Sequence, residues 1–208
     1  MNVVALISGR GSNLQAILDA GIAVTAVISN NPAAAGLAMA QSRGIPTRAI
    51  AHGDYAGRAE FDRALQDAID AYAPGLVVLA GYMRILTDDF VHHYAGRLMN
   101  IHPSLLPSFP GLQTHALALA EGVRIHGCTV HFVTPTLDRG PIVIQAAVPV
   151  LAGDTAESLQ QRVLAAEHRI YPRAVRWFLE GRLRIDTHGK VNLSAAEASE
   201  QSVLMTGA

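Results

Sequence analysis

The sequence predicts an α/β fold: a Rossmann-like, mainly parallel sheet flanked by helices, with an antiparallel strand pair in the C-terminal half. Three observations support this fold class. Short, unbroken apolar runs alternate with amphipathic helical segments, which is typical of strand-helix units that build a parallel sheet. The apolar runs hold almost no polar residues, as strands buried on both faces do. Glycine and proline gather where these segments end, which marks the turns between them.

The N-terminal half accounts for the parallel part of the sheet. Buried strands are expected at three apolar runs, residues 3–7, 24–28 and 76–79. Helices are expected between them, over residues 13–20, 36–42 and 59–72. The last helix is amphipathic, because its apolar side chains recur at helical spacing on one side, namely Phe61, Leu65, Ala68, Ile69 and Tyr72.

The C-terminal half is predicted to add three strands and two helices. We expect a short helix over residues 115–121 and strands over residues 97–101, 128–133 and 142–150. Residues 103–111 cannot continue a helix or a central strand, because they contain three prolines and a glycine. A long helix begins after Asp154 or Thr155, either of which can cap it. Pro172 is expected to break or kink this helix.

The chain is expected to form one domain over residues 1–185. It contains no internal repeat and no linker, and a length of 208 residues fits a single domain. From residue 186 onward the apolar density falls. Residues 186–208 are therefore expected to form a loosely held C-terminal tail.

Charge and cysteine content exclude several functional classes. Sixteen basic and seventeen acidic residues give a formal net charge of -1 without a Lys/Arg block, which argues against a basic face for nucleic acid or membranes. The single cysteine, Cys128, rules out a disulfide framework and is typical of a reducing compartment. The first apolar run is too short for a membrane span and follows no basic region. We therefore expect a cytoplasmic protein.

A glycine-rich turn at residues 8–13 (SGRGSN) follows the first predicted strand and opens the first predicted helix. Free backbone N–H groups at a helix N-terminus attract a phosphate. Leu14 replaces the third glycine of a dinucleotide fingerprint, and the Lys-Ser/Thr of a P-loop is missing. The expected ligand is therefore a single phosphomonoester. The alternative is a plain tight turn with Ser12 as the helix N-cap.

Asn100 and His102 lie at the end of another predicted strand, in the sequence Asn-Ile-His-Pro. Residues two apart in a strand point to the same side, so the amide and the imidazole can converge on one atom. That pair suits an oxyanion hole with an acid–base partner. The alternative is an asparagine that caps a loop beside a partly exposed histidine, and the spacing leaves both open.

Asp138 lies in the turn between two strongly apolar predicted strands. An aspartate before a glycine-proline turn is usually an ordinary turn residue. If this loop folds back toward His102, however, the carboxylate can orient the imidazole and stabilise the imidazolium. Only the fold can bring the two residues together.

The other histidines give little support for a metal site. His92 and His93 are adjacent and would diverge on a helix, and no His-x-x-x-His pair accompanies them. His131 shares a strand face with Thr129, so it is either packed in the core or a neighbour of the site. Residues 81–86 follow a buried strand, where exposed main chain can hydrogen-bond a flat heterocycle or apolar side chains can simply join the core.

Taken together, residues 8–14, 80–86, 100–107 and 127–140 resemble the phosphoribosylglycinamide formyltransferases, the folate-dependent glycinamide ribonucleotide transformylases. The match runs in order from Met1 to about Leu183. It implies the formyltransferase fold and a reaction of purine biosynthesis. A formyl group passes from the co-substrate 10-formyltetrahydrofolate to the amine of glycinamide ribonucleotide, giving formylglycinamide ribonucleotide and tetrahydrofolate. It implies small-molecule substrates, no metal, no nucleic acid, no membrane, and a monomer or homodimer.

The resemblance also implies roles for individual residues. The catalytic residues of the family match Asn100, His102 and Asp138. The N-terminal part would bind the ribonucleotide phosphate through Gly11, Ser12 and Asn13, and Glu167 would contact the glycinamide end. Folate is assigned to the C-terminal part together with residues that match Arg58, Met83, Arg84, Ile85 and Leu86, with Arg58 near the glutamate tail.

Three further positions complete the comparison with the family. Thr129 and His131 match positions that line the site behind His102. Leu164 departs from the pattern, because a polar substrate contact is expected where this apolar residue stands. The departure concerns the rim of the pocket and leaves the expected chemistry unchanged.

Two other functions stay open. Formyltetrahydrofolate hydrolases share the Asn-His-Asp chemistry, but they carry an additional N-terminal regulatory domain. Methionyl-tRNA formyltransferases share it too, but they add a C-terminal RNA-binding domain. From a different class, a noncatalytic module could sense a phosphorylated metabolite through the glycine turn. The small ribonucleotide acceptor is the favoured reading.

Overall fold

The computed structural model describes residues 1–194 and 202–204, and the chain divides into two compact units, Met1–Asn100 and Ile101–Ala208. The first unit is built on parallel strands and the second on an antiparallel pair. The predicted fold class is therefore confirmed. Among the described residues, no helix combines the length and apolarity needed to cross a membrane.

The first unit holds a parallel sheet with the strand order β5-β4-β1-β2-β3. The strands are β1 (Val3–Ile7), β2 (Ala26–Ser29), β3 (Thr47–Ala49), β4 (Leu76–Leu79) and β5 (Leu98–His102), which runs into the second unit. Central strand β1 is buried along its whole length, because both of its faces are covered by helices. This explains why its sequence, VVALI, contains no polar residue.

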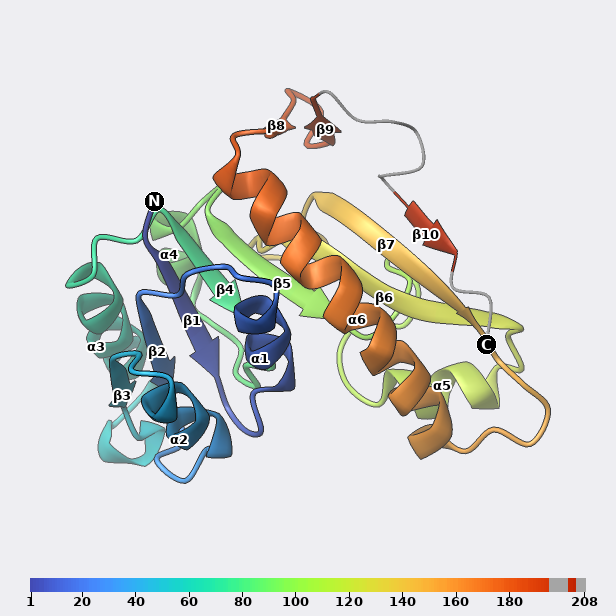
Figure 1. The fold of residues 1–208 in the computed structure, drawn as a ribbon, viewed down its shortest axis with the longest axis horizontal. Helices are drawn as coiled ribbons and strands as arrows, with labels where there is room; N and C mark the ends of the chain where they lie inside the picture. The colour runs from blue at the N-terminus through green and yellow to red at the C-terminus, as the bar shows by residue number, and fades with distance from the viewer. Residues whose placement is uncertain (195–201, 205–208) are drawn as a thin grey trace. The chain divides into compact units, whose positions relative to one another are not determined.

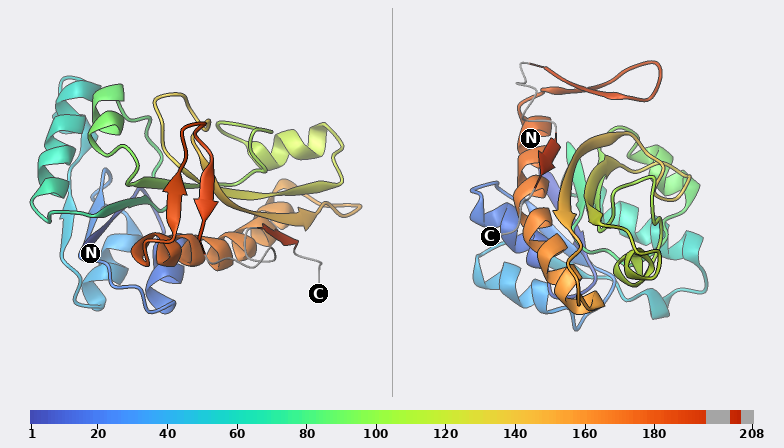
Figure 2. Two further views of the ribbon diagram at one scale, coloured as in Figure 1. Left: turned by 90° about the horizontal axis from the view of Figure 1, so that it is seen from above. Right: turned by 90° about the vertical axis from the view of Figure 1, so that its right-hand side faces the viewer.

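Helices cover both faces of this sheet. In Figures 1 and 2, α1 (Ser12–Asp19) and α2 (Ala35–Ser42) lie on one face, and α3 (Arg58–Asp70) and α4 (Asp88–His93) lie on the other. A short 3-10 helix, η1 (His52–Asp54), precedes α3. The order of strands places β2 on one side of β1 and β4 on the other, so the segments after β1 and β4 leave toward opposite faces. Such a switch point is where open α/β sheets bind ligands.

The second unit pairs β6 (Ile125–Phe132) with β7 (Ile142–Pro149) in antiparallel register, with a shift between Val130 and His131. Strand β10 (Ser202–Leu204) adds a parallel partner to β7. The helices are α5 (Thr114–Ala120) and the long α6 (Ala156–Leu179), which packs along β6 and β7 (Figure 1). Leu159, Val163, Ala166 and Ile170 of α6 are buried, as their helical spacing predicts.

Two predictions concern α6: the residue that caps its start and the effect of Pro172 in its interior. Thr155 is the N-cap: its hydroxyl accepts the Ser158 N–H, and the Ser158 hydroxyl accepts the Thr155 N–H. Pro172 does not break the helix, because α6 is continuous past this residue; the alternative, a kink, stays a prediction. Tyr171 and Ala174 on either side are fully buried, so packing of the helix outweighs the one backbone hydrogen bond that proline removes.

The chain beyond α6 contains a short hairpin, which reaches into the predicted tail. Strands β8 (Leu183–Ile185) and β9 (Val191–Leu193) form an antiparallel hairpin. Asp186 closes its turn by accepting the backbone N–H groups of His188 and Lys190, and these bonds lower the pKa of the Asp186 carboxyl. The remainder of the predicted tail, residues 195–201 and 205–208, lies outside the described residues.

The elements missed by sequence patterns are short. Strand β3 and helix α4 have three and six residues, which is too few for periodicity to show. By contrast, β1 and β4 begin and end where the apolar runs predict. Long apolar runs and long amphipathic helices were therefore predictable, and short edge elements were not.

Candidate active site

His102 is the last residue of β5 and is buried, with 5% of its surface exposed. Asn100 lies two residues earlier in the same strand and is half-buried. Alternation along a strand gives the two side chains the same face. A buried histidine beside an amide is the pair that the strand-end motif predicts.

Asp138, in the connection between β6 and β7, faces the His102 ring. Its Oδ2 atom lies 3.5 Å from His102 Nδ1, and each of the two side chains is 7% exposed. The same oxygen accepts the Gly111 N–H at 2.8 Å. The loop does fold back toward His102, so these residues, thirty-six positions apart in sequence, meet in a site shielded from water.

The backbone around Asp138 is constrained to hold this geometry. Asp138 has a φ of 52°, in the left-handed region that few residues other than glycine adopt. Such a conformation costs about 1–3 kcal/mol and persists only where its surroundings fix it. Two residues later, a Cβ on Gly140 would lie 1.7 Å from the Phe132 carbonyl oxygen. Only glycine allows the chain to return this close to β6.

The second ring nitrogen of His102 also faces an acceptor. His102 Nε2 lies 3.0 Å from the Phe109 carbonyl oxygen, and Phe109 itself has a φ of 53°. With a carboxylate beside Nδ1 and a carbonyl beside Nε2, the doubly protonated ring is the form that gives both nitrogens a donor role. This is the protonation state that an acid catalyst needs.

His131 faces the other oxygen of the Asp138 carboxylate. Its Nε2 is 3.8 Å from Asp138 Oδ1, and its Nδ1 is 2.9 Å from the Phe132 carbonyl oxygen. Burial lowers the pKa of His131, against the opposing effects of Phe132 and Asp138. A neutral His131 therefore packs against the carboxylate without competing for its charge.

A buried polar cluster fixes the loop after His102, and sequence reasoning found only one of its two side chains. The Thr129 hydroxyl donates to the Ser104 carbonyl at 2.7 Å and accepts the Leu106 N–H at 3.0 Å. Gln145 Nε2 donates to the Leu106 carbonyl at 2.8 Å and to Thr129 Oγ1 at 2.9 Å. The Leu106-Pro107 bond, whose isomer the sequence left open, is cis. The sequence could have pointed to Gln145, because it is the only polar residue in the apolar run at residues 142–150.

Two more histidines, His115 and His126, pack against each other, and His126 also packs against Phe109. The His126 ring lies edge-on to the rings of His115 and Phe109, at 5.4 and 5.8 Å. Burial lowers the pKa of His126 to about 4 and also lowers that of His115. Within the described part of the chain, no three His, Cys, Asp or Glu side chains are arranged to hold a metal ion.

Glu167 and Cys128 lie in the second unit as well. Glu167 is on α6 with 7% of its surface exposed, and Leu164 lies on the same helix and is half-buried. Cys128 on β6 is fully buried. Burial raises the pKa of its thiol well above the usual value, and the Glu167 carboxylate raises it further. A thiol in this state is no nucleophile.

In the first unit, the glycine-rich turn after β1 opens α1. The N-cap is Gly11, with a φ of 77° and without a capping side chain from the described residues. The alternative reading of Ser12 as the N-cap is therefore wrong, since Ser12 is the first helical residue. Gly36, which the sequence did not single out, backs the turn: its N–H donates to the Gly9 carbonyl, and a Cβ there would lie 3.2 Å from Gly11 Cα.

The segment after β4 carries the residues matched to folate binding. Met83 and Ile85 are 69% and 59% exposed, and buried Tyr82 and Leu86 flank them. The segment is held at its end by Asp62, whose Oδ2 accepts the Thr87 N–H. Met83 and Ile85 thus face water from a segment whose neighbouring residues are buried.

Two cations accompany this segment. The Arg84 guanidinium lies 4.8 Å from the centre of the Phe61 ring, which fixes its direction. Arg58 is the first residue of α3 and is exposed. Arg84 itself is half-buried.

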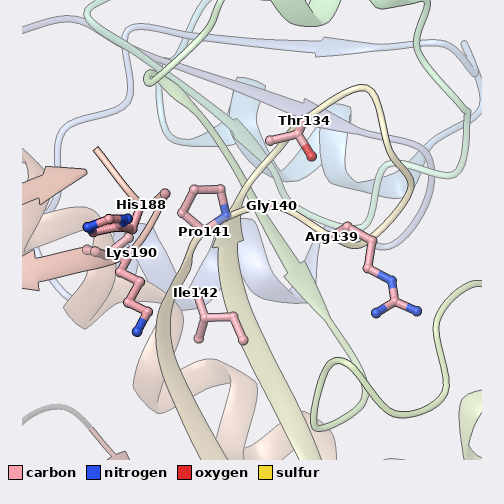
Figure 3. A pocket seen from close by; sticks show the side chains of 9 residues that line it. Thr134, Arg139, Gly140, Pro141, Ile142, His188 and Lys190 are labelled. Atoms are coloured by element: carbon pink, nitrogen blue, oxygen red, sulfur yellow. The ribbon is translucent and has the colours of Figure 1, made fainter. Parts of the chain in front are cut away.

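A pocket of about 580 Å³ lies elsewhere in the second unit, between residues 134–142 and the turn of the β8–β9 hairpin. Figure 3 shows His188 and Lys190 on one rim and Arg139 on the other, with Pro141 and Ile142 between them. Neither His102 nor Asp138 lines it. Its lining residues include no paired acid and base like His102 and Asp138.

Comparison with known proteins identifies the family. The formyl transferase family model matches residues 1–175. The chain is 53% identical over 191 residues to phosphoribosylglycinamide formyltransferase of Escherichia coli, covering 89% of this chain and 90% of the relative. It is 47% identical over 195 residues to the human trifunctional purine biosynthetic protein adenosine-3, covering 91% of this chain but spanning 19% of that longer protein.

A solved structure agrees with the sequence relatives. Phosphoribosylglycinamide formyltransferase from Coxiella burnetii, crystallised with CHES, is 46% identical and superposes with a TM-score of 0.90 over 99% of each chain. Both the sequence match and the shared fold extend over the segments that contain Asn100, His102 and Asp138. The chain therefore belongs to the formyl transferase family and is a formyltransferase.

Proposed function

We propose that this protein transfers a formyl group from 10-formyltetrahydrofolate to the amine of glycinamide ribonucleotide, in purine biosynthesis. The observation that carries the proposal is the buried contact between His102 and Asp138, at the end of the strand that also presents Asn100. Relatives named for this reaction match nearly the whole chain, which supports the choice of substrates.

Asn100 and His102 stabilise the charge that forms during transfer. A formamide carbonyl is a poor electrophile, so attack by the neutral amine builds negative charge on oxygen. The Asn100 amide donates an N–H to that oxygen. Protonated His102, held by Asp138, adds a charge-assisted hydrogen bond and then helps to protonate the departing folate nitrogen, directly or through water.

One contact must change before His102 can act in this way. Its Nε2 is bonded to the Phe109 carbonyl, while Nδ1 faces Asp138. The nitrogen that serves the substrate is thus the one occupied by the loop. We propose that residues 109–123 shift when ligands bind. Pro110 and Gly111 lie at the start of this segment, and Pro103 and Pro107 precede it, so its first residues form no regular helix or strand.

The amine attacks directly, without a covalent enzyme intermediate. The one thiol, Cys128, is buried and has a raised pKa. Asn100 and His102 supply the hydrogen bonds, His102 supplies the proton and Asp138 holds His102, so no step requires a metal. The reducing compartment indicated by a single cysteine supports a cytoplasmic location.

The two substrates are assigned to different parts of the chain. The phosphate of the ribonucleotide binds the first-turn N–H groups of α1, at Gly11, Ser12 and Asn13, where the helix dipole favours an anion. Glu167 binds the glycinamide end, with Thr129 and His131 behind the reacting atoms. Folate lies against Met83, Arg84, Ile85 and Leu86, and Arg58 approaches its glutamate tail.

One assay separates this proposal from its two alternatives. Absorbance reports the conversion of 10-formyltetrahydrofolate to tetrahydrofolate, measured with and without glycinamide ribonucleotide. The proposal requires turnover that depends on the ribonucleotide and yields its formyl derivative. Formate release at the same rate without the ribonucleotide would instead identify a hydrolase. Ligand binding with no turnover would identify a noncatalytic module.

A further inference from the structure

Ser8 is the first residue after β1 and lies within the turn proposed to bind phosphate. Its backbone N–H donates to the Gly81 carbonyl at 3.1 Å, so the chain leaving β1 is joined to the chain leaving β4. These are the two strands between which the sheet reverses its order. Ser8 therefore lies at the switch point of the sheet, where ligands are expected.

The Ser8 hydroxyl also joins the end of β2 to the ends of β1 and β4. It donates to Asn30 Oδ1 at 2.6 Å and accepts the Met83 N–H at 2.8 Å. A serine hydroxyl has one proton; Asn30 takes it, so the lone pairs are left for Met83. Asn30 directly follows β2 and is 7% exposed, which makes it a fixed point for the hydroxyl.

Two side chains, Ser8 and Asp62, anchor the segment from Met83 to Leu86. They come from different elements of the first unit. Asp62, on α3, accepts the Thr87 N–H at the far end at 2.6 Å. Ser8 holds the near end, and it lies three residues from Gly11 in the same short turn. Of these two anchors, Ser8 is the one that lies in the turn matched to phosphate, so its bond links that turn directly to the segment matched to folate.

We propose that Ser8 is a positioning residue that couples binding of the phosphorylated substrate to binding of the heterocyclic co-substrate. This inference rests on the proposed function, since it takes the two ligands from there. A phosphate on the N–H groups of Gly11 and Asn13 fixes the turn, and the Ser8 hydroxyl then fixes the Met83 N–H where the second ligand binds. Each ligand lowers the cost of ordering the other's segment, and linkage makes the effect reciprocal.

The test compares the affinity for one ligand with and without the other. Glycinamide ribonucleotide is titrated calorimetrically into the full-length protein, alone and with saturating tetrahydrofolate, the product that has no formyl group to transfer. The ratio of the two Kd values is the coupling factor. For the wild-type protein we expect about fivefold or more, the lower end of measured couplings. Ser8→Ala should bring the ratio close to one.

Two variants control for loss of structure. Ser8→Thr keeps the hydroxyl and should keep the coupling. Ser42→Ala makes the same chemical change in the first unit but removes only a local bond to the Met39 carbonyl, so it should leave the ratio unchanged. If Ser8→Ala does not fold in a thermal melt, Ser8→Cys, with its weak hydrogen-bonding group, takes its place.

The outcomes separate this inference from the proposed function. If the wild-type protein binds both ligands and transfers the formyl group, but Ser8→Ala keeps the wild-type ratio, Ser8 does not couple the sites. A wild-type ratio of one has the same meaning. If the wild-type protein neither binds the ribonucleotide nor transfers the formyl group, the proposed function itself is wrong.

Discussion

The proposed binding segments of the first unit and the acid–base site of the second use different parts of the polypeptide. In the first unit, ligands would meet backbone N–H groups at strand and helix ends, around Gly11 and Met83. In the second, buried side chains meet across the fold, as His102 and Asp138 do. Binding by main chain depends on local turns, whereas the acid–base pair depends on long-range packing. Substitutions in the second unit should therefore cost activity most.

The largest effect is expected at the His102–Asp138 pair. His102→Ala and Asp138→Ala should each lower turnover about a hundredfold or more, since one lost preorganised contact typically costs ~3 kcal/mol in the transition state. Both ligands should still bind. Steady-state kinetics and calorimetry with each purified variant provide the measurement.

A matched aspartate serves as the control for that pair. Asp154 is also buried and paired, with Arg162 at 2.8 Å, but it lies at the start of α6 outside the site. Asp154→Ala should lower the melting temperature and leave turnover near normal. Near-normal turnover in Asp138→Ala would remove that residue from the mechanism.

A smaller effect is expected where the backbone holds Asp138 in place. Gly140→Ala puts a Cβ against the Phe132 carbonyl, and overpacking of this kind costs about 1–3 kcal/mol. We expect lower stability and reduced turnover together, measured by urea unfolding and by the absorbance assay. Gly53→Ala, where a Cβ meets nothing within 4 Å, is the matched change. Equal stability of the two variants would show that Gly140 is not constrained.

A milder loss of turnover is expected when the Thr129–Gln145 cluster that holds the loop after His102 is disrupted. Gln145→Leu keeps the size of the side chain but deletes bonds to the Leu106 carbonyl and Thr129. A buried acceptor left unpaired costs about 1–3 kcal/mol, so stability should fall by that amount and turnover by about tenfold. Gln41→Leu, which loses one exposed bond to Thr47, should change neither. Normal turnover in Gln145→Leu would mean that the Thr129–Gln145 cluster contributes to folding only.

The smallest effect concerns acid stability. The folded-state pKa of His126 is about 4, below the value of about 6.5 in an unfolded chain. Between these values the unfolded state binds more protons, so stability falls as pH drops from about 6.5 to 4. His126→Phe should flatten this dependence in urea melts recorded across that range. His52→Phe, an exposed position in the first unit, should leave the slope unchanged.

Sequence patterns predicted the first unit better than the second, and the reason is physical. Runs such as VVALI and a glycine turn are local signals, and both lie where they were expected. The meeting of His102 with Asp138 could be stated only as a condition, because it depends on how two distant segments pack. The bonds from Gln145 to Leu106 and from Met83 to Ser8 were not predicted for the same reason, since the partners lie 39 and 75 residues apart.

The state of Cys128 has a practical use. The chain contains no other cysteine, and this thiol is buried with a raised pKa, so maleimide reagents should leave the native protein unlabelled. A cysteine introduced at an exposed position, such as Leu112→Cys, would then take a fluorophore at one defined place without prior removal of the native thiol. The protein is thus ready for single-site labelling, and a dye on that loop would report its movement as ligands arrive.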